Sequence, residues 1–115
     1  MHAVSITTHD GKSVARFTRV ASTFATRLIG LLNRKSLHRE EGLLISPGGS
    51  IHTIGMRFAI DAVFLDDQLQ VLKVASHIRP WRSVLAPRHT RHVLELRAGR
   101  IGELRLRVGM SIRTR

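Results

Sequence analysis

Residues 51–66, reading IHTIGMRFAIDAVFLD, hold the densest group of side chains in this chain that could do chemistry. His52, Thr53, Arg57 and Asp61 lie close together along a segment that is otherwise mostly apolar. Buried polar groups cost free energy unless they find partners, so a strand that only filled a core would not need them. We therefore interpret this segment as a candidate functional site.

A histidine beside an acid and an arginine could act as a general base, with Asp61 orienting His52 and Arg57 holding an anionic substrate. In a regular strand, however, Arg57 and Asp61 would lie about 13 Å apart on one face, at roughly 3.3 Å per residue. No nucleophile or second base is spaced to complete a catalytic set. We therefore favour a structural role, in which His52 and Thr53 satisfy loop backbone groups and Asp61 caps a turn or pairs with an arginine, and we expect no catalytic residue.

The hypothesis that ranks first is a non-enzymatic binding or accessory domain. In it, the loop before His52, the strand around Met56 and the loop around Trp81 surround a pocket for a small anionic or peptide ligand. The candidate ligand-binding residues are His52, Thr53, Met56, Arg57, Asp61, Trp81 and Glu95.

The charge of the chain indicates a second function. Nineteen Lys and Arg residues against eight Asp and Glu residues give a net charge of +11, and only Lys12, Lys35 and Lys73 are not arginine. Guanidinium groups favour bidentate contact with phosphate or carboxylate and stack on bases. Because ten arginines and only two acids follow residue 78, that part should form an electropositive face. Arginine-rich composition without a function is the competing explanation, and we rank it slightly higher.

Residues 79–92, reading RPWRSVLAPRHTRH, combine one aromatic side chain with several arginines, as single-strand binders do. The alternative is that Trp81 packs over the sheet as a lid and the arginines point to solvent. We favour this alternative, because one aromatic residue makes no stacking platform. The candidate nucleic-acid-binding residues are Arg79, Arg82, Arg88, Arg91, Arg105 and Arg107.

No metal site or cofactor is predicted. The chain has seven histidines but no cysteine, and the spacing of His89 and His92 suits two ligands on a helix better than on a strand. Gly48-Gly49 is not followed by the Lys-Ser/Thr pair of a phosphate-binding loop.

The elements that must position these residues are mostly strands. Residues 3–8 and 12–20 flank Asp10-Gly11, which predicts a hairpin. Residues 56–65 and 69–75 predict a central hairpin.

The remaining elements are predicted from the periodicity of apolar residues and from the positions of Gly and Pro, which interrupt regular structure. Residues 22–33 predict a core-facing amphipathic helix capped by Ser22, and residues 77–90 predict a long exposed connection. Residues 91–97 predict a strand, and residues 100–104 a single helical turn. Residues 104–113 alternate apolar side chains with mostly polar ones and predict a final strand that presents arginines to solvent.

A length of 115 residues predicts a single domain over residues 1–115, able to bury about two-thirds of the surface that its unfolded chain exposes. The opening residues lack a basic start followed by an apolar run, and no stretch approaches the roughly 18 apolar residues of a membrane span. We therefore expect a soluble, cytoplasmic protein without a membrane span.

Several motifs occur in a characteristic order: RLIGLL at residues 27–32, EGLL at 41–44, IHT at 51–53 with Met56-Arg57, IDAVFLD at 60–66 and HVLEL at 92–96. Together they resemble the prokaryotic family called domain of unknown function 192. This resemblance implies a compact, β-rich α+β domain with a partly closed, barrel-like sheet, and we expect one main amphipathic helix and short helical turns. It implies no established activity. Many relatives look exported, and where they commonly have an aromatic residue and a proline around the methionine strand, this chain has Ile54-Gly55 and Ala59.

Overall fold

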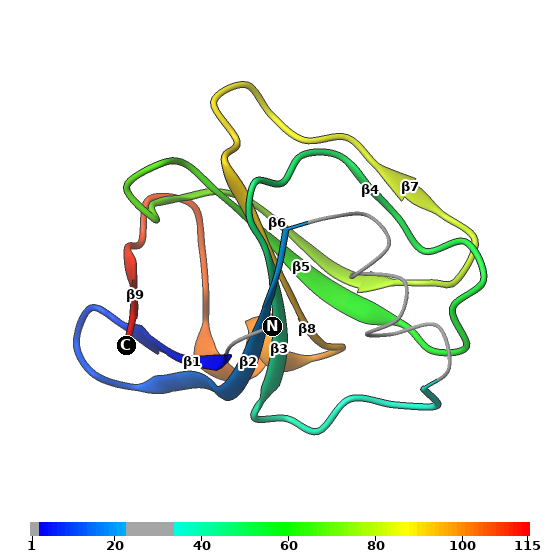
Figure 1. Cartoon of the computed structure of the whole chain (residues 1–115), viewed down its shortest axis with the longest axis horizontal. Coiled ribbons are helices and arrows are strands. Elements are labelled where there is room, and N and C mark those ends of the chain that lie inside the picture. Colours follow the sequence, from blue (N-terminus) through cyan, green and yellow to red (C-terminus); the bar gives the residue numbers. More distant parts are fainter. Residues whose placement is uncertain (1–2, 23–33) are drawn as a thin grey trace.

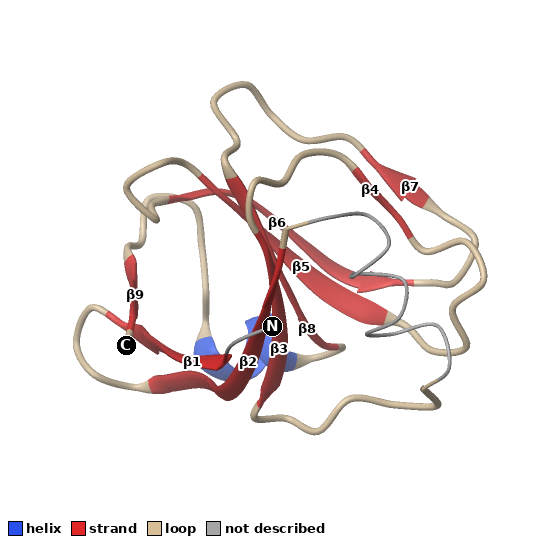
Figure 2. Ribbon diagram, viewed as in Figure 1, coloured by secondary structure: helices blue, strands red, loops and turns tan. Residues whose placement is uncertain are grey.

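The computed structural model describes residues 3–22 and 34–115. Its main element is a curled seven-stranded sheet with the strand order β6-β5-β8-β3-β2-β1-β9, beside which β4 and β7 form a two-stranded ribbon (Figures 1 and 2). The sheet is antiparallel except for the parallel pair of β2 and β3. The elements are β1 (Ala3–Thr8), β2 (Ser13–Ala21), β3 (Glu41–Ile45), β4 (Ile51–His52), β5 (Ile60–Leu65), β6 (Val71–Ile78), β7 (Ser83–Val84), β8 (His92–Arg97), α2 (Arg100–Leu104) and β9 (Ile112–Thr114).

The curl of the sheet brings its two edges together at one end. The N–H of Val71 donates to the carbonyl oxygen of Met110 at 2.7 Å. The N–H of Gly109 donates to the carbonyl oxygen of Val71 at 2.9 Å. The N–H of Ile112 donates to the carbonyl oxygen of Leu69 at 3.0 Å. We call this set of bonds the seam. The sheet is therefore a half-barrel, and the prediction of a β-rich, partly closed sheet is confirmed, although α2 is the one helix among the described residues.

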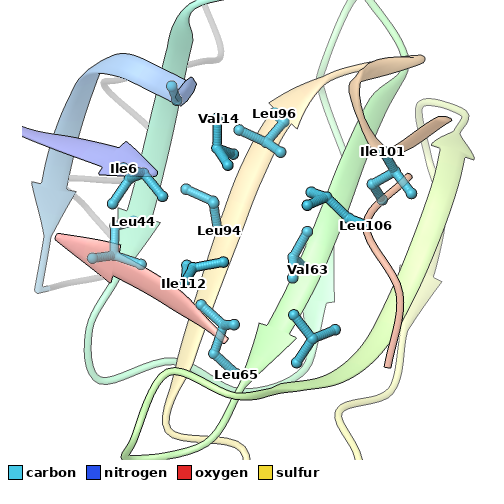
Figure 3. Packing of buried hydrophobic residues seen from close by; sticks show 12 residues of the cluster. Ile6, Val14, Leu44, Val63, Leu65, Leu94, Leu96, Ile101, Leu106 and Ile112 are labelled. Carbon is cyan, nitrogen blue, oxygen red and sulfur yellow. The ribbon is translucent and has the colours of Figure 1, made fainter. Parts of the chain in front are cut away.

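Apolar side chains cover both faces of the sheet. The first core cluster takes residues from all seven strands and fills the inside of the curl, where Ile6, Val63, Leu94 and Ile112 converge (Figure 3). The second cluster, which includes Phe64, Val93 and Met56, lies on the other face. Every residue of β5 is buried because its two faces belong to different clusters.

Several predicted elements are confirmed. β1 and β2 form the predicted hairpin, with Gly11 at a φ of 92° in its turn, where glycine lacks the steric penalty of other residues. β5 and β6 form the central hairpin. β8 and α2 occupy nearly the predicted ranges.

The prediction of a strand from residue 56 is wrong, because β5 begins only at Ile60. The N–H of Met56 donates to the carbonyl oxygen of Thr53 at 3.2 Å, which closes a turn, and Gly55 has a φ of 83°. Backbone groups used in this turn cannot pair in a sheet. Arg57 therefore lies outside the strand that holds Asp61, and the spacing expected for the two side chains does not apply.

The prediction of a final strand over residues 104–113 is also wrong, since β9 covers only Ile112–Thr114. Leu104 ends α2, and Arg105 and Gly109 adopt positive φ angles of 54° and 95°, which interrupt an extended strand. Residues 109–112 form the seam instead.

The connection predicted over residues 77–90 is only partly correct. β6 continues to Ile78 instead of ending at residue 75, and β7 pairs with β4 within the connection. The amphipathic helix predicted over residues 22–33 lies outside the described residues except for Ser22. Across residues 3–22 and 34–115, no helix is long and apolar enough to cross a membrane.

Candidate functional site

Thr53 fastens two segments that are far apart in the sequence. Its buried hydroxyl donates to the carbonyl oxygen of Arg79 at 2.6 Å and accepts from the N–H of Arg82 at 2.9 Å. Its own N–H donates to the carbonyl oxygen of Arg82 at 2.8 Å, and its carbonyl oxygen accepts from the N–H of Trp81 at 3.0 Å. We call the paired residues 51–57 and 79–85 the β4–β7 ribbon. A single threonine thus connects its two halves next to the short strands.

Trp81 projects from this ribbon into solvent. Its side chain is 64% exposed, and its backbone has a φ of 64°, an unfavourable angle that the bond to Thr53 helps to hold. Ile54 and Leu85 of the same ribbon are also exposed, at 47% and 77%. The favoured interpretation that Trp81 packs over the sheet as a lid is therefore wrong.

The other candidates of the ribbon differ in accessibility. His52 is half-buried, and its Nδ1 accepts from the N–H of Ile54 at 3.3 Å. Met56 is buried in the second core cluster, whereas Arg57 is exposed. The prediction that His52 and Thr53 satisfy loop backbone groups is confirmed.

Asp61 is buried and serves as an acceptor for three backbone groups. One carboxylate oxygen accepts from the N–H of His77 at 2.8 Å. The other accepts from the N–H groups of Gly99 and Ile101, at 3.1 and 2.8 Å. The structural role predicted for Asp61 is confirmed, because its carboxylate holds β6 and the start of α2.

Asp61 and Glu95 lie on opposite faces of the sheet. Asp61 lies on the same face of β5 as Val63, which belongs to the first core cluster. Glu95 is buried opposite Ala62 and shares a face of β8 with Val93, which belongs to the second cluster. The structure does not bring these two carboxylates into one pocket.

The arginines divide into separate groups. Arg79, Arg82, Arg88 and Arg91 are exposed within or after the β4–β7 ribbon, and Arg105 and Arg107 are exposed beyond α2. Near the ribbon, in residues 51–58 and 79–92, the sequence has no Asp or Glu.

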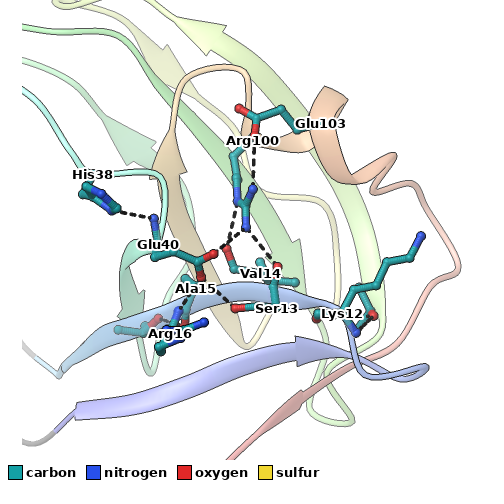
Figure 4. A network of polar contacts seen from close by, with 11 residues as sticks. Lys12, Ser13, Val14, Ala15, Arg16, His38, Glu40, Arg100 and Glu103 are labelled. Atoms are coloured by element: carbon teal, nitrogen blue, oxygen red, sulfur yellow. Dashed lines mark hydrogen bonds and ion pairs between the residues drawn. The ribbon is translucent and has the colours of Figure 1, made fainter.

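Arg100, in contrast, is only 2% exposed, so this one of the ten arginines after residue 78 adds no exposed charge to that part. Its guanidinium donates to the carbonyl oxygens of Val14 at 3.1 Å and Ser13 at 2.9 Å (Figure 4). It also pairs with Glu40 at 3.3 Å and Glu103 at 3.1 Å. A hydrogen bond from the Ser13 hydroxyl, helped by the Arg16 N–H and the charge of Arg100, lowers the pKa of Glu40.

The described residues contain no group of three or more His, Asp or Glu side chains that could hold a metal ion. His89 has a φ of 71° in the loop before β8, whereas His92 lies in β8 with its Nδ1 2.8 Å from the Ser46 hydroxyl. Burial lowers the pKa of His92.

A curled, β-rich half-barrel with a side ribbon thus defines the structural class. The model of the DUF192 family, described as Uncharacterized ACR, matches residues 5–114, and the chain belongs to this family. UPF0127 protein PF1050 of Pyrococcus furiosus is 31% identical over 104 residues, which cover 86% of this chain and 87% of that protein. UPF0127 protein PH1112 of Pyrococcus horikoshii is 32% identical over 82 residues, covering 67% and 69% of the two chains.

The fold is also found in a crystal structure of a protein of unknown function from Novosphingobium aromaticivorans. The two structures have a TM-score of 0.82 at 25% sequence identity, and the match covers 96% of this chain and 83% of the other. The resemblance predicted from the sequence motifs is therefore confirmed.

Thr53→Val should loosen the ribbon, because valine keeps the shape of threonine but removes the hydroxyl bonded to Arg79 and Arg82. We expect a loss of about 2 kcal/mol in unfolding free energy, from one unpaired carbonyl and one unpaired N–H. In urea, the emission of Trp81, the only tryptophan, should change before the far-UV circular dichroism does. Thr114→Val, an exposed change in β9, is the control. Equal midpoints for Thr53→Val and the wild type would contradict the role of the hydroxyl.

Proposed function

We propose that this protein is a non-enzymatic binding or accessory domain whose ligand contacts the β4–β7 ribbon. The observation that carries the proposal is Trp81, a 64% exposed side chain on a backbone fixed by Thr53. Tryptophan and arginine are among the residues most enriched at positions that dominate binding energy. A rigid indole also loses little conformational entropy when a ligand covers it.

The charge of the ribbon favours an anionic ligand. Arg57, Arg79 and Arg82 are exposed, and the sequence around them has no acidic residue. Exposed Ile54 and Leu85 add apolar area beside the indole. An acidic peptide segment that carries an apolar or aromatic side chain matches both properties. In this proposal His52, Thr53 and Met56 support the surface, Asp61 holds β6 and the start of α2, and Glu95 is buried in β8.

Single-stranded nucleic acid is the second candidate ligand. Exposed Arg88 and Arg91 extend the basic surface beyond Trp81, which could stack on one base. The affinity of such binding would fall steeply with salt concentration. For each phosphate neutralised, a tenfold rise in salt would weaken binding by about tenfold.

Fluorescence polarisation with a labelled acidic peptide and a labelled single-stranded oligonucleotide, each across a salt series, tests the proposal. We expect the peptide to bind more tightly at physiological salt, with a shallow salt dependence. Trp81→Ala and Arg57→Ala should each weaken peptide binding by about tenfold. Arg105→Ala/Arg107→Ala, which removes two charges beyond α2, should leave it unchanged.

Other outcomes would overturn the order of the candidates or the proposal itself. Tighter binding of the oligonucleotide with a steep salt dependence would make nucleic acid the ligand class. Binding of neither probe at low salt, or equal losses for the ribbon variants and Arg105→Ala/Arg107→Ala, would exclude the ribbon as the binding surface.

A further inference from the structure

The seam of the half-barrel borders an open cleft of about 850 Å³. The β1–β2 turn contributes His9, the β5–β6 turn contributes Gln68, and residues 107–113 form the remaining wall. In Figure 1 this region and the β4–β7 ribbon lie at opposite ends of the long axis of the molecule. The cleft is therefore separate from the surface proposed above.

The cleft is positively charged. Arg107 and Arg113 line it, and among the described residues no acidic one does. Both arginines are exposed, and in the described part of the chain neither guanidinium is held by an ion pair or hydrogen bond. These donors remain available to a ligand that can accept bidentate hydrogen bonds.

A smaller adjoining cleft of about 280 Å³ extends the same basic region. The two clefts share His9, Arg107 and Met110, and the smaller one adds Lys12 and Arg105. Asp10 is the acid that lines it among the described residues, and its carboxylate is hydrogen-bonded to the hydroxyl of Thr8. Cations therefore outnumber acids in both clefts.

One wall of the larger cleft is apolar. Val108 is 63% exposed and Met110 is half-buried, and both line the cleft beside Arg107. A ligand that met only the arginines would leave this wall in water. The combination suits a molecule with an anionic end and a flat apolar body.

The wall is held in place by the seam. Gly109 and Met110 bond to the backbone of Val71, and the side-chain amide of Gln70 donates to the carbonyl oxygen of Gly109 at 3.3 Å. A binding surface fixed before the ligand arrives costs less ordering entropy. Mouths of β-barrels are also common places for small-molecule sites, and pockets of about 300–1,000 Å³ are the usual size.

We propose that this cleft binds a phosphorylated small molecule of mononucleotide size, with its phosphate on Arg107 and Arg113 and its apolar body against Val108 and Met110. A compact phosphate ester fits better than a polymer, because Arg107 and Arg113 line the same cleft of limited volume.

Titration of the ¹⁵N-labelled protein with adenosine monophosphate, followed by NMR of the backbone amides, tests this proposal. We expect saturable shifts in residues 107–113 and none in the β4–β7 ribbon. Arg107→Ala/Arg113→Ala should weaken binding by at least about tenfold. Arg79→Ala/Arg82→Ala removes the same charge from the ribbon and should change the affinity by less than about twofold.

The apolar wall has its own test. Ribose 5-phosphate should bind several-fold more weakly than adenosine monophosphate, and Val108→Ser should reduce that difference. No saturable shift in residues 107–113, or equal losses in the two double arginine variants, would overturn the proposal. A single-stranded oligonucleotide that bound far more tightly than the mononucleotide at residues 107–113 would also overturn it, in favour of a nucleic-acid strand. These readouts are independent of peptide binding at the ribbon.

Discussion

Asp61→Asn should lower the free energy of unfolding by about 4 kcal/mol, the largest effect that we expect for any single change in this chain. The carboxylate is buried and accepts from three backbone N–H groups. Asparagine can accept with its oxygen, but its amide nitrogen would face either His77 or the pair Gly99 and Ile101. One or two buried N–H groups would lose their acceptor and point toward another donor.

Urea unfolding followed by circular dichroism measures this effect. Asp67→Asn is the matched control, because Asp67 is an exposed aspartate in the β5–β6 turn. We expect that change to stay within about 0.5 kcal/mol of the wild type. An Asp61→Asn protein within about 1 kcal/mol of the wild type would show that the three bonds contribute little net stability.

Arg100→Met should cost about 3 kcal/mol of unfolding free energy, because methionine keeps the apolar stem of arginine and removes all of its donors. The change would leave the partly buried Glu40 carboxylate and the carbonyl oxygens of Ser13 and Val14 without this partner. Arg100→Lys should be intermediate, since one ammonium group cannot reproduce the planar set of donors.

The control for this change is Arg105→Met, which removes an exposed arginine from the C-terminal cap of α2. It should have little effect on unfolding in urea. Equal stabilities for Arg100→Met and Arg105→Met would mean that the hydrogen bonds and ion pairs of the buried guanidinium only offset the free-energy cost of its desolvation.

The sequence predicted correctly those strands whose signals are local, such as a turn pair between two short runs or a continuous apolar run. Asp10-Gly11 between β-compatible segments marks the first hairpin, and the strand predicted over residues 56–65 contains β5, which begins only at Ile60. The turn at residues 53–56 could not be found in this way, because it depends on Thr53 pairing with residues 79–82. The alternation over residues 104–112 was misleading for a similar reason. Leu106 and Ile112 do point into the core, but the chain between them bends to form the seam.

The candidate site was predictable in composition but not in geometry. The sequence identified Thr53, Asp61 and Trp81 as unusual, and each has a distinct role in the structure. That Asp61 and Glu95 lie on opposite faces depends on strand register, which the sequence alone did not supply. Buried Arg100 was missed because arginine is normally exposed, although Glu103 three residues later could have indicated an ion pair on the helix. The cleft at the seam was missed because its walls come from three distant segments.

The emission of Trp81 during titration with the acidic peptide tests the central claim most directly. Trp81 is the only tryptophan, so its spectrum reports on the β4–β7 ribbon alone. If the ligand covers this 64% exposed indole, the emission should shift to shorter wavelength and saturate with the dissociation constant found by polarisation. An unchanged Trp81 spectrum while polarisation shows saturated binding would contradict the claim that the ribbon is the ligand-binding surface.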